Sequence, residues 1–280
     1  MFTRRRMLGI GFAAGASALA YPTVLEPRWL DVTHTSLPNP HSAPTARILH
    51  LSDLHASWCV PWSLMEAAVR DGLAQHPDLI CLTGDFVTDG LETDTNRYIR
   101  VLRTLSAAKP TFAVLGNHDG GSWSGERGGY SDYRAVERLL ETAHVELLHN
   151  RSRQLDLASG RINLLGVGDY WSNEVDPRRA GQALVPTEST LALCHNPDAK
   201  DLLSPLPWQL MLCGHTHGGQ VMIPFEGPRY APVIDKRYVS GLNPYEDRYI
   251  YTTRGVGSLG GVRFGCRPEV TILEFPLLSR

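Results

Sequence analysis

The stretch RILHLSDLH, residues 47–55, decides the fold of this chain and the place of its chemistry. Residues 47–52 are largely apolar and predict a buried strand, and Asp53 and His55 follow where that strand ends. Alternate residues of an extended segment point to one face, so these two side chains are expected to converge. A carboxylate and an imidazole that converge are suitable ligands for a divalent metal ion.

Four more segments repeat this pattern of an apolar strand followed by a polar turn. They are Gly84-Asp85, Gly116-Asn117-His118-Asp119, His195 and Gly214-His215-Thr216-His217. With Asp53 and His55 they supply enough ligands for two metal ions that share one bridging carboxylate. Two adjacent cations suit the hydrolysis of phosphate esters, because one activates water and both neutralise the phosphoryl oxygens.

Each segment alone also has a purely structural interpretation. Asp85 can cap a helix, residues 117–119 can form a turn, His195 can be a loop histidine, and residues 215–217 can form a hairpin. The occurrence of all five segments at strand ends of one chain favours the metal site over these separate interpretations.

Strands and helices alternate in the first half of the chain. Helical spacing of apolar residues over 61–75, 95–107 and 132–142 separates strands predicted at 47–52, 79–83, 111–115 and 145–148. This alternation predicts a largely parallel sheet, which collects ligands at the carboxyl ends of its strands. The second half is richer in strands, predicted at 154–157, 162–167, 190–193, 209–212, 220–223, 248–252 and 270–275.

We therefore expect an α/β fold, a four-layer α-β-β-α sandwich of two mixed sheets flanked by helices. The sequence predicts one domain over residues 47–280, preceded by an extended lead-in over 21–46 that is rich in Pro, Ser and Thr.

Residues 1–20 are typical of a targeting signal. A basic head with an arginine pair, residues 3–8, runs into an uncharged stretch over 7–20 that ends in Ala18-Leu19-Ala20. The arginine pair and the modest hydrophobicity resemble a twin-arginine export signal. We expect the twin-arginine machinery as a partner and a location in the periplasm or on the outer face of the cytoplasmic membrane. An uncleaved signal that acts as an anchor, and a basic terminus followed by a weak amphipathic helix, stay open as alternatives.

Composition sets further bounds. The net charge of the 280 residues is −2, which gives no reason to expect nucleic acid as a partner. The five cysteines show no Cys-x-x-Cys pair and are expected to be structural thiols. The chain also has no Gly-x-Ser-x-Gly elbow and no Walker loop.

The five segments, in this order, resemble the calcineurin-like metallophosphoesterase superfamily and its exported or membrane-associated bacterial branch. The resemblance implies two divalent ions, of Mn, Fe or Zn. The first is held by Asp53, His55 and His217, the second by Asn117, His195 and His215, and Asp85 bridges the two. It also implies that His118 stabilises charge on the phosphoryl group or protonates the leaving oxygen, and that Asp119 orients the His118 imidazole.

The resemblance implies a hydrolase in which hydroxide attacks phosphorus in line. We expect a phosphodiester or a lipid-linked pyrophosphate as the substrate, with nucleotide-sugars as a further candidate class, together with contact to a membrane surface. A phosphomonoesterase and a non-catalytic metal-binding scaffold stay as alternatives.

Several residues outside the five segments are candidates for substrate contact. Trp58, Trp62 and Trp123 can hold an apolar leaving group or can simply pack at the start of a helix or in a loop. Arg254 and Arg263 can bind a substrate phosphate, because a guanidinium matches phosphate geometry. A structural role for these two arginines is an equal alternative.

Overall fold

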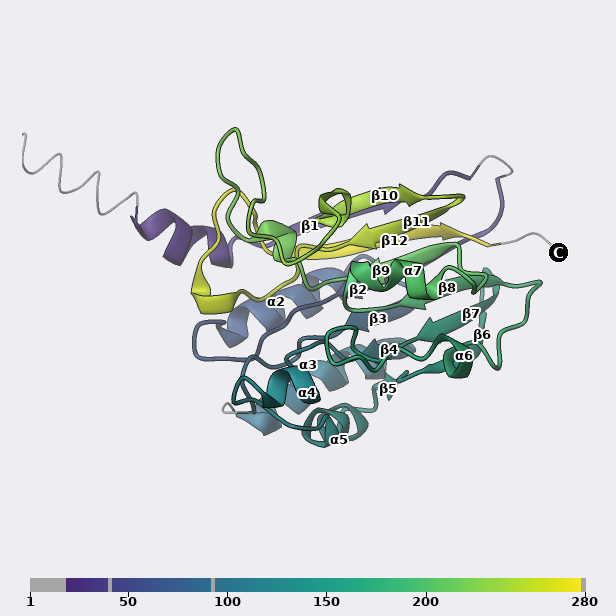
Figure 1. Ribbon diagram of the computed structural model, residues 1–280, viewed down its shortest axis with the longest axis horizontal. Coiled ribbons are helices and arrows are strands. Elements are labelled where there is room, and N and C mark those ends of the chain that lie inside the picture. Colours follow the sequence, from purple (N-terminus) through teal and green to yellow (C-terminus); the bar gives the residue numbers. More distant parts are fainter. Residues whose placement is uncertain (1–18, 40–41, 92–93, 278–280) are drawn as a thin grey trace, which may run out of the picture.

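The computed structural model describes residues 19–39, 42–91 and 94–277 (Figure 1). The predicted targeting signal therefore lies almost wholly outside the described residues. Among those residues, no helix combines the length and the apolar character that crossing a bilayer requires.

The first sheet has the strand order β1-β12-β2-β3-β4-β5. Its strands are β1 (Asp31–Ser36), β2 (Thr45–Leu51), β3 (Leu79–Thr83), β4 (Thr111–Val114), β5 (Glu146–Leu147) and β12 (Glu269–Pro276). The strands β2 to β5 are mutually parallel, as the alternating pattern predicts, and β12 is antiparallel to β2. The crossovers between them carry α2 (Trp62–Leu73), α3 (Thr95–Ala108) and α5 (Arg134–Thr142).

The second sheet has the order β10-β11-β9-β8-β7-β6. Its strands are β6 (Arg151–Leu157), β7 (Gly160–Gly166), β8 (Ser189–Leu193), β9 (Leu210–Cys213), β10 (Gly241–Tyr245) and β11 (Arg248–Thr252). The four central strands are parallel, and the two edge strands are antiparallel to their neighbours. Both sheets are thus mixed, as expected.

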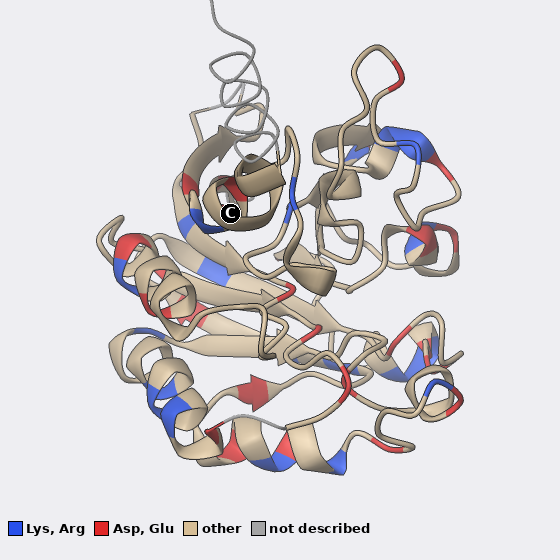
Figure 2. Cartoon of the chain, turned by 90° about the vertical axis from the view of Figure 1, so that its left-hand side faces the viewer, with Lys and Arg blue, Asp and Glu red and all other residues tan. Residues whose placement is uncertain are grey.

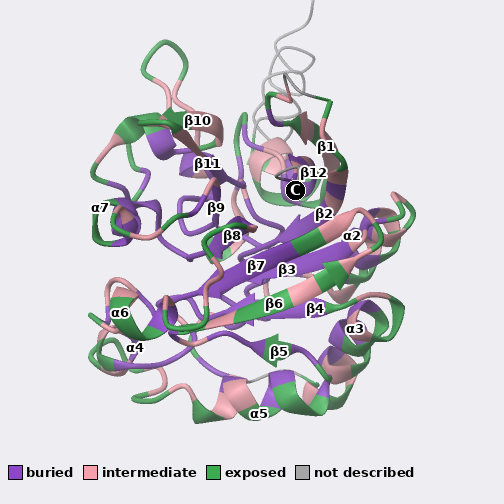
Figure 3. Ribbon diagram, turned by 90° about the vertical axis from the view of Figure 1, so that its right-hand side faces the viewer, coloured by how far each residue is buried: buried purple, intermediate pink, exposed green. Residues whose placement is uncertain are grey.

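The two sheets pack face to face over a core that includes Ile48, Leu79, Leu191 and Leu210. The helices α2, α3 and α5 cover the outer face of the first sheet, where Leu49, Ile80 and Ala113 are buried. The outer face of the second sheet is covered by the short helices α6 (Pro177–Ala180) and α7 (Lys200–Leu203) and by loops that bring in Trp208 and Tyr238. In Figure 3, β3 is buried, whereas β6 at the edge is largely exposed. The prediction of two mixed sheets flanked by helices is confirmed.

The remaining helical segments are single turns. They are α4 (Ser122–Gly125), η1 (Tyr21–Leu25), η2 (Glu26–Arg28), η3 (Pro197–Ala199), η4 (His217–Gly219), η5 (Lys236–Tyr238) and η6 (Leu259–Gly261). All five cysteines are free, and all except Cys59 are buried, which agrees with structural thiols.

Three stretches differ from the expectation. The strand β10 was not predicted; it lies at the edge of the second sheet and pairs antiparallel with β11. The lead-in over 21–46 contains β1, an edge strand whose polar residues pair with β12 and give no apolar pattern that could be recognised. The strand predicted over 220–223 is wrong. Its residues form turns, with one bridge from Val221 to Phe264 and one from Ile223 to Gly227.

Candidate metal centre

The carboxyl ends of the parallel strands of both sheets lie at one end of the molecule. All five predicted segments lie there. The backbone N–H of Asp53 donates to the carbonyl of Gly84 (2.9 Å), and that of Gly214 donates to the carbonyl of His195 (2.9 Å). The two sheets are joined by the His215 N–H, which donates to the Asp53 carboxylate (3.0 and 3.2 Å to Oδ1 and Oδ2). Segments far apart in the sequence therefore form one pocket.

Five of the predicted metal ligands have left-handed backbone. The φ angles are 52° at Asp53, 46° at His55, 54° at Asp85, 71° at His215 and 51° at His217. Asp53 and His55 therefore do not converge by the alternation of an extended strand, as the sequence suggested; each is turned into the pocket by a tight backbone reversal. Such conformations cost about 1 kcal/mol or more per non-glycine residue and concentrate at functional sites.

Two glycines permit the close approach of these turns. A Cβ added at Gly214 would collide with Ser52 Oγ and Asp53 Oδ2, and one added at Gly116 would collide with Asp85 Oδ1. These positions accept no side chain, because metal-binding carboxylates fill the space.

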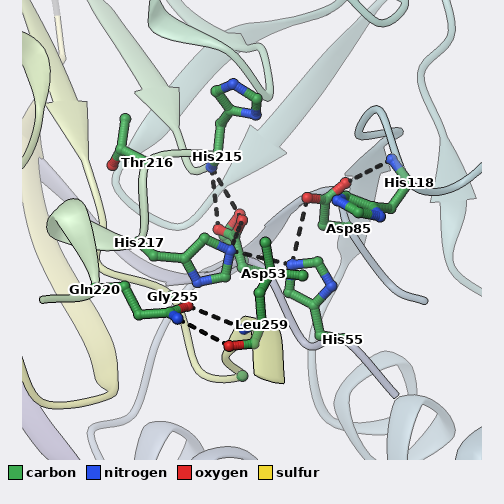
Figure 4. A network of polar contacts seen from close by, with 12 residues as sticks. Asp53, His55, Asp85, His118, His215, Thr216, His217, Gln220, Gly255 and Leu259 are labelled. Atoms are coloured by element: carbon green, nitrogen blue, oxygen red, sulfur yellow. Dashed lines mark hydrogen bonds and ion pairs between the residues drawn. The ribbon is translucent and has the colours of Figure 1, made fainter. Parts of the chain in front are cut away.

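The potential ligand atoms form two buried clusters. Figure 4 shows the residues of the first of them. The first contains Asp53, His55, Asp85 and His217, and the second contains Asp85, His195 and His215. Within each cluster the ligand atoms lie within 4.8 Å of one another. Asp85 belongs to both, and the same carboxylate oxygen, Oδ2, faces a histidine of each cluster.

The distances are short for groups of this kind. In the first cluster His55 Nε2 lies 3.1 Å from His217 Nε2 and 3.4 Å from Asp85 Oδ2. In the second, His195 Nε2 lies 3.2 Å from Asp85 Oδ2 and 3.3 Å from His215 Nδ1. Within each cluster, imidazole nitrogens and carboxylate oxygens lie close together. Mn, Fe and Zn ions accept this set of donors.

Asn117 fits the second cluster through an unsatisfied atom. The His118 N–H donates to Asp85 Oδ1 (3.0 Å), which places this turn beside Asp85. Asn117 Oδ1 is buried and has no hydrogen-bond partner among the described residues. A buried amide oxygen without a partner costs about 1–3 kcal/mol, and a cation would satisfy it.

Backbone carbonyls set which ring nitrogen carries the proton. His195 Nδ1 donates to the carbonyl of Thr83 (2.6 Å). A carbonyl can only accept, so in neutral His195 the lone pair is on Nε2, the atom that faces Asp85. His55 Nδ1 lies 3.2 Å from Thr88 Oγ1, which can play the same part.

The charges of the ligands follow from burial and from their neighbours. Burial lowers the pKa of His55 and of His215 to about 3, and that of His217 well below its usual value, so these three are neutral. Burial alone would also lower the pKa of His195. The negative charges of Asp85 and Asp53 outweigh the effect of burial and raise this pKa to about 10. Burial would raise the pKa of Asp85, yet His195 and His118 hold it well below the ordinary value. A metal ion must therefore displace a proton from His195.

His118 occupies a different place from the ligands. It is half-buried, whereas the ligands are buried, and its ring centroid lies 5.1 Å from that of His55. Its Nδ1 donates to the carbonyl of Thr88 (2.7 Å), which leaves Nε2 with the lone pair in the neutral ring. This orienting partner is a backbone carbonyl and not Asp119.

The predicted role of Asp119 as the partner of His118 is wrong. Its carboxylate is buried and accepts four backbone N–H groups, from Asp85 (2.8 Å), Phe86 (2.7 Å), Val87 (3.2 Å) and Gly116 (2.8 Å). Both oxygens are engaged in this way. Asp119 therefore links two turns, the one that contains Asp85 and the one that begins at Gly116.

The two arginines follow the structural alternative. Arg263 is fully buried, and its guanidinium donates to the carbonyls of Arg254 (2.8 Å), Gly255 (3.0 Å), Gly257 and Cys266 (3.1 Å). Arg254 donates to Glu269 (3.0 Å) and Asp31 (2.9 Å). These contacts engage both guanidinium groups within the fold.

The structure adds two residues that sequence reasoning missed. Thr88 contacts both His55 and His118. The Trp171 ring packs edge-on against His215, with centroids 4.2 Å apart, and lies 5.2 Å from the ring of Trp123, which in turn packs on His118. Trp123 thus lies at the site as proposed, but its partner Trp171 is in a loop that carries no motif.

Comparison with known proteins gives consistent matches. A family model described as calcineurin-like phosphoesterase matches residues 46–219. The chain is 42% identical over 277 residues to phosphodiesterase YaeI of Escherichia coli K12, covering 98% of this chain and 99% of that protein. It is 28% identical to the UDP-2,3-diacylglucosamine pyrophosphatase LpxG of Chlamydia trachomatis, covering 89% of this chain and 90% of that protein.

Among solved structures, the NAD nucleotidase of Haemophilus influenzae superposes with a TM-score of 0.50 at 14% identity. The match covers 78% of this chain but spans about half of that enzyme, 46%. At this identity the likeness concerns the fold alone.

Proposed function

The chain belongs to the calcineurin-like phosphoesterase family, and on that premise we propose which bond it cleaves and which residues take part. It is a metallophosphoesterase, a hydrolase. Its substrate is a phosphodiester or a lipid-linked pyrophosphate, and nucleotide-sugars are a further candidate class. The observation that carries the proposal is the pair of buried clusters that share Asp85.

The seven ligands divide between two ions. Asp53, His55 and His217 would hold the first, Asn117, His195 and His215 would hold the second, and Asp85 would contribute to both. Two divalent ions held by these residues would activate water and neutralise charge on the phosphoryl oxygens. The mixed oxygen and nitrogen donors suit Mn, Fe or Zn.

His118 is the residue proposed to act on the substrate. The Thr88 carbonyl holds its Nδ1 proton, and its half-exposed ring lies against His55 at the edge of the first cluster. In the protonated state His118 can donate from Nε2 to the oxygen that leaves phosphorus.

Two observations favour a diester or pyrophosphate over a monoester. The relatives named above are a phosphodiesterase and a pyrophosphatase of a diacylated nucleotide-sugar. Trp123 and Trp171 also flank His118 and His215, which gives an apolar wall beside the reacting group.

We also propose that the chain is exported through the twin-arginine route to the periplasm or the outer face of the cytoplasmic membrane. This proposal is supported by the arginine pair and the uncharged stretch in residues 3–20.

The test is hydrolysis by the purified, Mn²⁺-loaded protein of bis-p-nitrophenyl phosphate against p-nitrophenyl phosphate. Faster cleavage of the diester supports the proposal, and preference for the monoester contradicts it. Bound metal without turnover of either compound identifies a scaffold. The His118→Ala variant should keep its metal and slow about 10²- to 10⁴-fold. Loss of both ions from that variant would overturn the role of His118.

A further inference from the structure

Exposed apolar side chains gather at the end of the molecule that carries the metal centre. We name Leu25, Trp58, Phe225, Leu259 and Phe264 the apolar rim. Trp58 is 88% exposed, Phe225 is fully exposed, and the other three are also classed as exposed. Exposed apolar surface on this scale marks a site of interaction more often than chance.

The rim belongs to four segments that contact one another. The Tyr21 ring in η1 packs edge-on against Phe264, and the Arg263 N–H donates to the carbonyl of Pro22 (2.8 Å). The Met222 N–H donates to the carbonyl of Phe264 (2.8 Å), which joins the hairpin of Phe225 to the same loop. Cys59 Sγ contacts the carbonyl of Ser258 (3.7 Å), which joins the turn of Trp58.

Hydrogen bonds to buried residues and within the turns hold these segments, and with them the exposed apolar side chains. Phe225 lies in a turn closed by two hydrogen bonds between Ile223 and Gly227, of 3.0 and 2.8 Å. The loop of Phe264 is anchored by the buried Arg263, and the buried Glu26 accepts from the Cys266 N–H (2.5 Å). Buried polar groups therefore hold the loop whose apolar side chain is exposed.

The rim lies beside the metal centre. Gln220, three residues after His217, donates to the carbonyl of Leu259 and accepts from its N–H (2.8 and 2.9 Å; Figure 4). Figure 2 looks onto the side of the molecule on which η1 lies in Figure 1. A surface that covers the rim would thus lie close to the reacting groups.

We infer that the apolar rim is a membrane-docking surface whose partner is the interface of a phospholipid bilayer. The chain itself points to this partner, because the uncharged stretch of residues 7–20 leads directly into η1, where Leu25 is exposed. The tips stand singly on separate turns, which suits insertion among lipid headgroups and acyl chains. A protein partner would instead need a matching pocket for each tip.

The inference does not require the proposed substrate, because docking is a property of the surface. If both hold, a lipid-linked phosphate would reach the metal centre from the bilayer without leaving it. That link makes two separate readouts necessary.

The experiment reports which face of the full-length chain touches lipid. Phe225→Trp places a reporter on the rim, and Leu202→Trp places a matched reporter at another exposed apolar position, on α7. Each variant is mixed with vesicles of phosphatidylethanolamine and phosphatidylglycerol whose acyl chains carry bromine, a quencher of tryptophan. Fluorescence is compared with that in unbrominated vesicles and with wild type.

We expect the fluorescence added by Phe225→Trp to be largely lost in brominated vesicles, and that added by Leu202→Trp to be retained. Replacing Trp58 by Phe should remove most of the quenchable signal of the wild type. Equal quenching of the two reporters, or none in either, overturns the inference, as does a chain that fails to float with vesicles. A stable lipid-free dimer that Phe225→Ser dissociates would assign the rim to a second copy and likewise overturn it.

Hydrolysis of soluble bis-p-nitrophenyl phosphate is measured on Phe225→Trp and Leu202→Trp and should be unchanged, since neither position belongs to the metal centre. Retained hydrolysis without rim quenching defeats only the docking surface. Rim quenching without any hydrolysis defeats only the proposed function.

Discussion

At the scale of single residues, Asp85 connects the two halves of the metal centre. It is the one residue common to both buried clusters found among the described residues. Its carboxylate also accepts the His118 N–H, so it positions the candidate acid as well. Removing it should therefore affect more than one ligand position.

The Asp85→Ala variant tests this. We expect its metal content to fall from two ions per chain to one or none, because each cluster loses its shared oxygen. Metal analysis after gel filtration measures the content, with Asp247→Ala, at an exposed surface position, as the control. Two ions retained in Asp85→Ala would show that the carboxylate does not bridge.

Asp119 gives a second test at this scale. Asp119→Asn replaces one oxygen that accepts backbone N–H groups by an NH₂ group, which can only donate. We expect the free energy of unfolding to fall by about 2 kcal/mol or more, since a buried N–H group left without an acceptor costs about 1–3 kcal/mol. Urea denaturation measures the loss, with Asp71→Asn at the surface as the control. Unchanged stability with slower turnover would restore the original view of Asp119 as the orienting partner of His118.

Single residues also mark the limit of what the sequence could predict. Six of the seven predicted ligands lie in the two clusters, because strand-ending Asp and His residues are visible in a sequence. The left-handed backbone at Asp53 and His55 was not foreseen, since tertiary contacts impose it on residues that rarely adopt it. Thr88 and Trp171 were missed because their contacts join separate loops and leave no local pattern.

At the scale of elements, the loop over residues 254–257 supports the first cluster by hydrogen bonds to the backbone of Ser52 and Asp53. The Gly257 N–H donates to the carbonyl of Asp53 (2.6 Å), and the Val256 N–H donates to that of Ser52 (3.0 Å). Arg263 holds this loop by its carbonyls and is fully buried. The loop is thus a support for Asp53.

Arg263→Lys tests the support. A lysine has three donors on one nitrogen and cannot reach the four carbonyls that the planar guanidinium reaches. We expect a loss of about 2 kcal/mol or more in unfolding free energy, together with weaker metal binding. Urea denaturation and metal titration measure the two effects, and Arg237→Lys at the surface is the control. A stability within about 0.5 kcal/mol of wild type would contradict this role, since such small changes are typical of surface substitutions.

Elements with a clear apolar pattern were predictable, and those shaped by their partners were not. The helices α2 and α3 and the strand β3 lie within a few residues of their predicted bounds, because each buries a periodic apolar face. The edge strand β1 is polar and is formed by pairing with β12. Val221 and Ile223 make an apolar pattern over 220–223 but have only isolated bridges.

At the scale of the whole molecule, the stability of the metal-free protein should depend on pH through His195. Its pKa in the fold is raised from 6.5 to about 10, because Asp85 and Asp53 outweigh the effect of burial. A group with a raised pKa contributes its full stabilisation below the unfolded value, and that contribution is lost as the pH rises through the folded value.

We therefore expect the EDTA-treated chain to lose unfolding free energy, relative to His195→Gln, as the pH rises from 6.5 to about 10. Urea denaturation of both proteins across this window gives the difference. Metal-loaded wild type should show less of this dependence, because the ion takes the place of the proton. A difference that stays constant or grows with pH would refute the protonation assigned to His195.

The joining of the two sheets through the His215 N–H and the Asp53 carboxylate has a consequence for biogenesis. The ligands of the first cluster are split between sequence positions 53–85 and His217, and His55 and His217 are 162 residues apart. A growing polypeptide on the ribosome can offer only part of this cluster until nearly four-fifths of it has been made. Cation capture must then be a late event, close to the completion of synthesis, and the ion that is acquired will be the one supplied by the compartment in which the chain matures.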